Sequence, residues 1–248
     1  MSEVVVVRDA AEGAHIAAEL FVEITSGAAI ARGTASAALT GGSSAVPLYT
    51  ALRSDEWIRR VPWDALQLFT GDERAVPMDD ARSNAGVAAR ELLAHAPMDV
   101  ARFHRMKGEA PDLAAEAKRC AQELRQTLGT RDALPRFDLV LLGLGSDGHV
   151  LSLFAGVNSS AERGDRELVR AVEAPLVVEP KVARISLVPM LLLNARCIVL
   201  HTMGAAKAPV LKRALTGPED LIACPAQWLR RASGRVVIIA DEAAAQGL

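Results

Sequence analysis

Short apolar runs alternate with longer amphipathic stretches along the chain. The short runs are continuous, which is typical of strands that are covered on both faces. The longer stretches repeat apolar residues every three or four positions, which is typical of helices with one buried side. The predicted strands are residues 4–7, 35–39, 66–69, 139–142, 168–173, 183–187, 197–202 and 236–240. The predicted helices are the segment that follows Asp9 and residues 45–52, 83–93, 112–128, 188–195, 204–215 and 225–231.

Strands and helices alternate from one end of the chain to the other, and no linker, low-complexity tract or internal repeat interrupts them. This order predicts that residues 1–248 form a single three-layer, doubly wound α/β domain with a largely parallel, Rossmann-like sheet. The short spacing between the strands at 168–173 and 183–187 is consistent with an added hairpin.

A glycine-rich loop follows the central predicted strand, in the stretch FDLVLLGLGSDGHVLSLFAG. Gly143, Gly145 and Gly148 allow sharp turns and a close approach of the backbone to a ligand. Asp147 and His149 lie among these glycines, at the end of a buried strand. Open α/β sheets bind their ligands at the carboxyl ends of their strands. The stretch is therefore the candidate active-site loop.

The spacing of these three glycines also matches the dinucleotide fingerprint GxGxxG. That motif normally opens the first crossover helix, whereas this loop lies past the middle of the chain. General acid–base chemistry fits better, because a carboxylate such as Asp147 fixes the tautomer of a neighbouring imidazole and raises its basicity. His104 and His201 have no carboxylate near them in the sequence. The alternative for His149 is a loop histidine that only hydrogen-bonds the backbone.

Two further strand ends carry polar residues. Thr40–Ser44, with the sequence TGGSS, separates a strand from a helix start, and free N–H groups at a helix N-terminus favour an anion. An ordinary tight turn is the alternative. Asp72-Glu73-Arg74 follows the third strand, where charged residues usually form a solvated turn, although a functional role stays open.

Composition and charge limit the classes of partner. The net charge of -2 creates no global field for nucleic acid or an anionic membrane. Cys120, Cys197 and Cys224 have no metal-like spacing, so we expect reduced thiols. Residues 33–52 are uncharged and long enough to span a membrane, but their glycines, Pro47 and hydroxyls favour a strand, a loop and a helix start. Since the N-terminus also lacks an export-signal pattern, we expect a cytoplasmic protein with no nucleic-acid or membrane partner.

Motifs for two common catalytic machineries are missing from the sequence. It contains no HExxH or similar ligand cluster, so we expect no metal and no other cofactor. It contains no GxSxG elbow, so a serine nucleophile is not indicated.

Five blocks of sequence carry a resemblance to a known family. The blocks are LTGGSSAVPLY, FTGDERAVPMDDARSN, LVLLGLGSDGHVLSLFAG, RISLVPMLLLNA and GAAK, and they follow one another across nearly the whole chain. Together they resemble the 6-phosphogluconolactonases, which form a wider group with glucosamine-6-phosphate deaminases. The resemblance implies a doubly wound α/β fold and hydrolysis of the small molecule 6-phospho-D-glucono-1,5-lactone to 6-phosphogluconate, in the oxidative pentose phosphate pathway.

The resemblance also implies roles for individual residues. His149 matches the family's general base, and Asp147 would orient it. Arg74 is a candidate for stabilising the negative charge that develops on the carbonyl oxygen, as is a loop N–H group. The positions implied for binding the substrate and its phosphate are Gly41, Gly42, Ser43, Asp72, Arg184 and Lys207, with Arg74 also near the phosphate.

The chain departs from the family's usual DGHTASLFPG, because Val150 and Ala155 replace a threonine and a proline. Any role of that threonine is then lost or moved to Ser152. Deaminases carry a glutamate and a proline shortly after the histidine, whereas residues 151–156 contain no carboxylate, which favours lactone hydrolysis. A deaminase or isomerase, and a non-catalytic phosphosugar sensor, remain the alternatives. The polar stretch 157–167 predicts an exposed loop that is a candidate lid.

Overall fold

The computed structural model describes residues 2–42, 45–129, 134–156 and 167–248. Its centre is a seven-stranded sheet in which every neighbouring pair of strands is parallel. The strands, in spatial order, are β1 (Glu3–Val7), β10 (Arg235–Asp241), β9 (Cys197–Thr202), β6 (Leu139–Gly143), β2 (Ala35–Leu39), β3 (Leu66–Thr70) and β5 (Phe103–His104). The glycine-rich loop therefore leaves the middle strand of the sheet.

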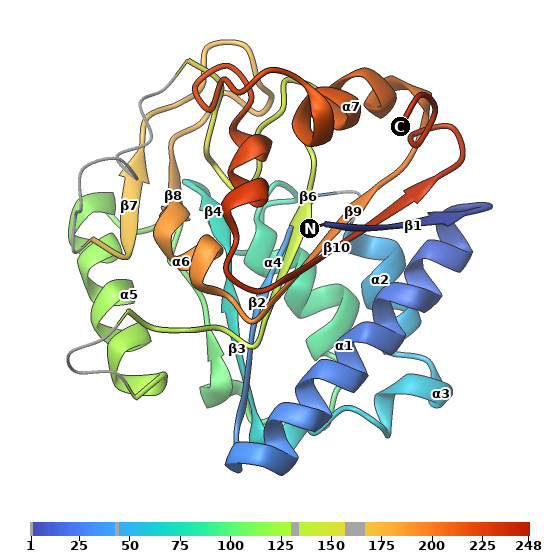
Figure 1. The fold of residues 1–248 in the computed structure, drawn as a ribbon. Helices are drawn as coiled ribbons and strands as arrows, with labels where there is room; N and C mark the ends of the chain where they lie inside the picture. The colour runs from blue at the N-terminus through green and yellow to red at the C-terminus, as the bar shows by residue number, and fades with distance from the viewer. Residues whose placement is uncertain (1, 43–44, 130–133, 157–166) are drawn as a thin grey trace.

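Helices cover both faces of this sheet (Figure 1). One face carries α1 (Ala10–Arg32), α2 (Ala45–Leu52), α3 (Asp55–Ile58) and α4 (Asn84–Ala88), which continues as a π turn at Ala89–Leu93. The other face carries α5 (Leu113–Thr127), α6 (Pro189–Asn194), α7 (Ala208–Thr216) and the 3₁₀ helix η6 (Pro225–Arg231). The predicted three-layer α/β fold is confirmed. The extent of a single domain over residues 1–248 stays a prediction.

Successive residues of β6 show why the sheet needs helices on both sides. Leu139 and Leu141 pack into the core under α1 and α2, whereas Val140 and Leu142 pack into the core under α5 to α7. Side chains alternate between the two faces of a strand, so an unbroken apolar run has to be buried on both. This is the physical basis of the strand predictions: of the eight predicted strands, the structure keeps the bounds of two, extends four by one residue at one or both ends and shortens two.

A second sheet of three antiparallel strands lies beside the first. It contains β4 (Asp72–Arg74), β8 (Arg184–Leu187) and β7 (Val169–Val172), in that order. The predicted hairpin is β7 with β8. The prediction of a solvated turn at residues 72–74 is wrong, because β4 pairs with β8 and Glu73 is only 1% exposed.

Capping side chains set the starts of three α-helices. The side chains of Asp9, Ser83 and Asp112 accept hydrogen bonds from free N–H groups at the starts of α1, α4 and α5. The helix predicted at 204–215 begins as the 3₁₀ turn η5 (Ala205–Lys207) and becomes α-helical only in α7. Two further 3₁₀ turns are η1 (Trp63–Ala65) and η3 (Val100–Arg102).

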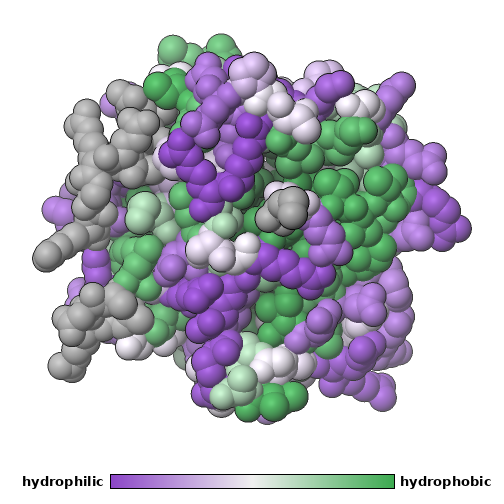
Figure 2. Space-filling model, in the orientation of Figure 1, coloured by the Kyte–Doolittle hydropathy of each residue, from purple (hydrophilic) through white to green (hydrophobic). Residues whose placement is uncertain are grey.

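Helix α1 is long and apolar enough to cross a membrane, the one such helix in the described ranges. Its Ala17, Ala18 and Phe21 are fully buried in the core between α1 and the sheet. A core helix passes the same test of length and composition, and this packing is that of a core helix. Figure 2 shows hydrophobic surface over the edge strand β1, where Val4 and Val6 are exposed.

Candidate active site

A cavity of about 660 Å³ lies at the carboxyl edge of the parallel sheet. Its walls come from the segments that follow β2, β3, β6 and β9, together with residues of the 177–184 segment. Sequence-distant loops meet there because all seven strands run in the same direction. Of the predicted site residues, the cavity is lined by Gly41, Gly42, Asp72, Arg74, Asp147, His149, Arg184 and Lys207, whereas Ser43 lies outside the described residues.

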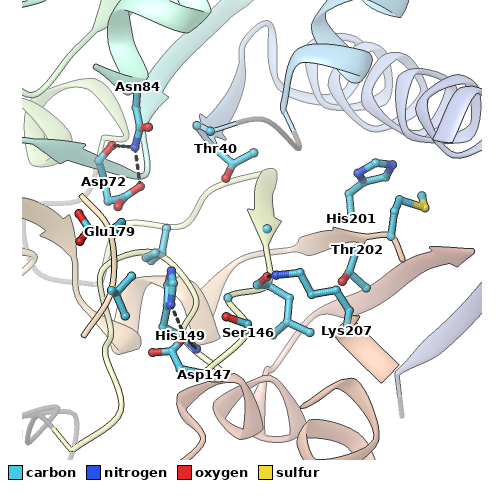
Figure 3. Close-up of a pocket in the computed structure, with 18 of the residues that line it drawn as sticks. Thr40, Asp72, Asn84, Ser146, Asp147, His149, Glu179, His201, Thr202 and Lys207 are labelled. Carbon is cyan, nitrogen blue, oxygen red and sulfur yellow. Dashed lines mark hydrogen bonds and ion pairs between the residues drawn. The ribbon is translucent and has the colours of Figure 1, made fainter. Parts of the chain in front are cut away.

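Asp147 and His149 form a hydrogen-bonded pair in this cavity (Figure 3). The Oδ1 atom of Asp147 lies 2.5 Å from Nδ1 of His149, and it also accepts a hydrogen bond of 3.3 Å from the His149 backbone N–H. With Nδ1–H donating to the carboxylate, the neutral imidazole carries its lone pair on Nε2. Both side chains are about three-quarters buried, at 23% and 24% exposure. The arrangement is the one a general base requires.

Two glycines have separate tasks in the loop that presents this pair. Gly145 makes room for it, because a Cβ atom there would lie 2.0 Å from His149 Nδ1 and 2.6 Å from Asp147 Oδ1. The turn is closed by hydrogen bonds from Gly145 N–H to the His149 carbonyl (2.9 Å) and from Gly148 N–H to the Gly145 carbonyl (3.0 Å). Gly148 adopts a φ of 90°. Turns and no helix follow at residues 149–156, so the loop lacks the helix that a dinucleotide fingerprint opens.

The Asp147 carboxyl is kept ionised by its partner. Burial raises its pKa, but the hydrogen bond and positive charge of His149 outweigh burial, so the pKa lies below its usual value. The carboxylate therefore holds the imidazole in one orientation and stabilises the imidazolium that forms after proton uptake.

The Gly41–Gly42 turn forms the opposite wall, between β2 and the start of α2. Gly41 must lack a side chain, since a Cβ atom would lie 1.7 Å from Asn84 Oδ1. Gly42 has a φ of 75° and accepts a hydrogen bond from Ala45 N–H (3.3 Å) at the first turn of α2. The first N–H groups of α2 thus begin at the cavity wall, as an anion site requires.

The three predicted cations reach the cavity from three different elements. Lys207 donates from Nζ to the Leu144 carbonyl (2.8 Å). Arg74 donates from Nη1 to the Arg82 carbonyl (2.6 Å), and its Nη2 lies 3.9 Å from where a Cβ of Gly42 would stand. These contacts hold two positive charges beside the Gly41–Gly42 turn and the end of β6.

Arg184 is more deeply buried than the other two cations, at 3% exposure. Its Nη2 and Nε donate to the carbonyls of Pro180 (2.9 Å) and Val182 (3.2 Å), so its guanidinium also fixes the 180–182 segment at the cavity rim. Burial lowers its pKa, and the neighbouring charge of Asp72 opposes that shift.

Asp72 links its own strand to two other segments by hydrogen bonds. Its Oδ1 accepts from Asn84 Nδ2 (2.9 Å) and its Oδ2 accepts from the Ser152 hydroxyl (2.6 Å). Ser152 therefore ties the active-site loop to β4, while Val150, which replaces the family's threonine, is fully buried. Both oxygens of Asp72 already have protein partners, so its first task is to position the loop.

Glu73 holds the neighbouring segment in a similar way. Its carboxylate accepts hydrogen bonds from the backbone N–H groups of Asn84 and Ala85 (both 2.7 Å) and from the Ser83 hydroxyl (3.0 Å). The side chain thereby fixes the start of α4 against β4, beside the cavity-lining residues Asp72 and Arg74. Burial raises the pKa of Glu73, against the effect of these hydrogen bonds.

Several lining residues were not singled out as site residues from the sequence. Thr40 and Asn84 lie within the blocks that carry the family resemblance, which was the available signal. Glu179, His201 and Thr202 line the cavity without any local motif to mark them. Burial lowers the pKa of His201.

His104 has a carboxylate partner that the sequence did not indicate. Its Nδ1 lies 2.9 Å from Glu123 Oε1 of α5, and its Nε2 lies 2.8 Å from Gln67 Oε1. This pair is outside the cavity.

The candidate lid at 157–167 lies, apart from Glu167, outside the described residues. Across the described ranges, no group of three or more His, Cys, Asp or Glu side chains could hold a metal ion.

A parallel sheet with a hydrogen-bonded Asp–His pair, a glycine turn at a helix start and cations at its carboxyl edge is typical of α/β proteins that act on a small anionic ligand. The family model described as glucosamine-6-phosphate isomerases/6-phosphogluconolactonase matches residues 8–238. The chain belongs to this family, and the resemblance found in the sequence is confirmed.

Named relatives agree with this membership. The chain is 32% identical over 252 residues to a 6-phosphogluconolactonase of Streptomyces coelicolor, covering 99% of this chain and 94% of the relative. The solved 6-phosphogluconolactonase of Trypanosoma cruzi superimposes with a TM-score of 0.87 and 30% identity, over 100% of this chain and 97% of that one. A monomeric glucosamine-6-phosphate deaminase has a TM-score of 0.81 at 22% identity, over 98% of both chains, which shows a shared fold.

Proposed function

We propose that this protein is an enzyme that hydrolyses 6-phospho-D-glucono-1,5-lactone to 6-phosphogluconate in the oxidative pentose phosphate pathway. The observation that carries the proposal is the Asp147–His149 pair, with 2.5 Å between Oδ1 and Nδ1, inside a cavity that also contains Arg74, Arg184 and Lys207. Relatives support it, since three proteins that are 30–32% identical over 83–99% of this chain are 6-phosphogluconolactonases. A cytoplasmic location fits a soluble sugar phosphate as substrate.

Binding would rest on the phosphate. The start of α2 offers backbone N–H groups, Arg74 stands beside the Gly41–Gly42 turn, and Lys207 lines the same cavity at the end of β6. A hydrogen bond to a charged group contributes about 1.5–3 kcal/mol. Two or three such bonds are sufficient for the ~4–8 kcal/mol of millimolar to micromolar affinity. Arg184 would contact the sugar from the rim side.

The chemical step would use His149 as the base. A water molecule attacks C1 of the lactone while Nε2 of His149 takes one of its protons, and Asp147 stabilises the imidazolium that results. When the tetrahedral intermediate collapses, the bond between C1 and the ring oxygen breaks. The imidazolium returns the proton to that oxygen, which becomes the C5 hydroxyl, and the carboxylic acid formed at C1 releases its proton to water to give the carboxylate.

The negative charge on the carbonyl oxygen needs a donor nearby. Arg74 was predicted for this task, but its Nη2 lies near the Gly42 position, which supports phosphate binding more directly. We therefore propose that backbone N–H groups of the 143–149 loop stabilise the oxyanion, because this loop also positions His149. Arg74 would then act on the phosphate side.

A deaminase is the second candidate for the same fold. Residues 151–156 carry no carboxylate, but Glu179 brings one to the cavity wall from another segment. Its side chain is mostly exposed and faces Lys181 at 3.8 Å. A rim carboxylate that is held this loosely is poorly placed to assist ring opening, so the proposal remains lactone hydrolysis.

One experiment compares the candidates directly. Freshly generated 6-phosphogluconolactone is supplied to the purified protein and formation of 6-phosphogluconate is followed with a coupled dehydrogenase, while ammonia release from glucosamine 6-phosphate is followed in parallel. We expect hydrolysis well above the spontaneous rate and no ammonia. Ammonia release without lactone hydrolysis would assign the deaminase activity, and inactivity in both assays together with tight 6-phosphogluconate binding would indicate a sensor.

A further inference from the structure

One side of the cavity holds buried polar atoms that the proposed reaction does not use. His201 and Thr202 end strand β9, line the cavity and are 6% and 3% exposed. Neither ring nitrogen of His201, nor the hydroxyl of Thr202, has a hydrogen-bond partner within the described part of the chain. In Figure 3 the two residues group with Lys207, on a different side of the cavity from Asp147 and His149.

Such atoms are unusual in a folded protein. A buried donor or acceptor without a partner costs folding free energy, so native structures pair nearly all of them. Here three unpartnered atoms belong to two consecutive residues that face one cavity. This concentration indicates groups that are completed by a ligand.

The residues packed around the imidazole of His201 are small or apolar. The residue beside it in the sheet is Gly143 of β6, which has no side chain. On the helix side lies Gly13 of α1, where a Cβ atom would stand 3.0 Å from His201 Nε2. The other neighbour of His201 in the sheet is Ile239 of β10, which is apolar, so none of these three neighbours offers the imidazole a side-chain hydrogen bond.

His201 also faces the side of the sheet on which the anion-binding turn lies. Val199 packs in the core that contains Ala45 and Leu48 of α2. Side chains alternate along a strand, so His201, two residues after Val199, points to the same side, and Thr202 points to the opposite side with Leu200. The start of α2, with its free N–H groups, lies on that side too. Lys207 reaches the end of β6, the strand that lies between β9 and β2 in the sheet.

We propose that His201, on the side of the Gly41–Gly42 turn, and Thr202, on the other side of the end of β9, bind the phosphate group of the substrate and so determine the preference for a phosphorylated lactone. The inference rests on the proposed function. An imidazole N–H and a hydroxyl donate to phosphate oxygens, and the charge of Lys207 lies beside them. The phosphate and the reacting C1 are at opposite ends of the substrate. In the same way, His201 and Thr202 lie on a different side of the cavity from His149.

The test uses His201→Leu and Thr202→Val, with His95→Leu as the control at an exposed histidine away from the cavity. Calorimetry measures the Kd of 6-phosphogluconate and of unphosphorylated gluconate. Loss of one hydrogen bond to a charged group weakens 6-phosphogluconate binding about 10- to 100-fold, with gluconate binding and the control unchanged. The Tm of the free variants stays equal or rises, because the deleted atoms have no protein partner.

Other outcomes overturn the inference. If both variants bind 6-phosphogluconate like the wild type, or lose affinity for both ligands alike, His201 and Thr202 do not recognise phosphate, whether or not the protein hydrolyses lactone. If the wild type neither hydrolyses lactone nor binds 6-phosphogluconate, the proposed function fails. Inorganic phosphate is then the probe. If the wild type binds phosphate and the two variants do not, the result supports the phosphate subsite. If the wild type does not bind phosphate, the subsite is disproved.

Discussion

At the scale of the residue, the site depends on which polar atoms are already paired. His149 uses Nδ1 for Asp147 and keeps Nε2 for the substrate side. Lys207 and Arg184 use part of their donors on backbone carbonyls of Leu144 and Pro180. Side chains anchored in this way lose less conformational freedom when a ligand binds, which preserves more of the interaction energy for affinity.

Replacing His149 tests the base. We expect His149→Ala to lower kcat by about 10²–10⁴-fold, the usual contribution of a positioned base, with KM changed little because the phosphate contacts remain. Steady-state kinetics on fresh lactone measures both constants. His15→Ala, at an exposed histidine of α1, is the matched control. A His149→Ala enzyme with the kcat of the wild type would end the assignment of His149 as the base.

Replacing Lys207 tests the phosphate side. We expect Lys207→Ala to raise KM by about 10-fold or more, because a charge-assisted hydrogen bond is lost, with a smaller effect on kcat. Lys212→Ala is the control, since Lys212 is an exposed lysine on α7. An unchanged KM in Lys207→Ala, or an equal rise in both variants, would show that Lys207 serves only to hold the Leu144 carbonyl.

At the scale of the element, strand ends and glycine turns place these residues. The loop after β6 brings Asp147 and His149 together because Gly145 leaves the volume they occupy. β4 is short and polar, yet it is buried because Glu73 accepts hydrogen bonds from the start of α4. The sequence pattern for β4 resembles a surface turn, since polarity along a chain does not reveal which donors will surround a carboxylate.

The loop geometry predicts the effect of a single methyl group. Gly145→Ala places a Cβ atom 2.0 Å from His149 Nδ1, so we expect the pair to be displaced and kcat to fall at least about 10-fold, as a misplaced base would give. Gly27→Ala is the control, because a Cβ atom there meets nothing within 4 Å and lies on α1. A Gly145→Ala enzyme with unchanged kcat and pH profile would contradict this role of the glycine.

At the scale of the whole molecule, the edge of the sheet opposite the cavity serves stability. Asp138 precedes β6 at this amino edge, is 5% exposed and accepts hydrogen bonds from Ser36 N–H (2.9 Å) and from Arg32 at the end of α1. Arg196, just before β9, is a second cation 3.2 Å away. One carboxylate thus ties a helix and three neighbouring strands together, far from the chemistry.

Its removal should therefore affect folding and not catalysis. We expect Asp138→Ala to lower the free energy of unfolding by about 1–3 kcal/mol, since Ser36 N–H becomes a buried donor without its acceptor. Urea unfolding measures the change, and kcat of the folded enzyme should stay within about twofold of the wild type, as for a change remote from the reacting atoms. Asp55→Ala, at a 97% exposed carboxylate, should leave both quantities unchanged. A large drop in kcat would mean that the two edges of the sheet are coupled.

The sequence by itself determined the alternation of strands and helices, the parallel sheet, the loop with Asp147 and His149, and the family. These features follow from local causes: apolar period, capping side chains, glycine turns and contiguous motifs. The tertiary structure decided the burial of Asp72 and Glu73, the link from Ser152 to Asp72, and the presence of Glu179, His201 and Thr202 in the cavity. Each of these joins residues from separate segments, and only the packing of the sheet and its loops brings such segments together.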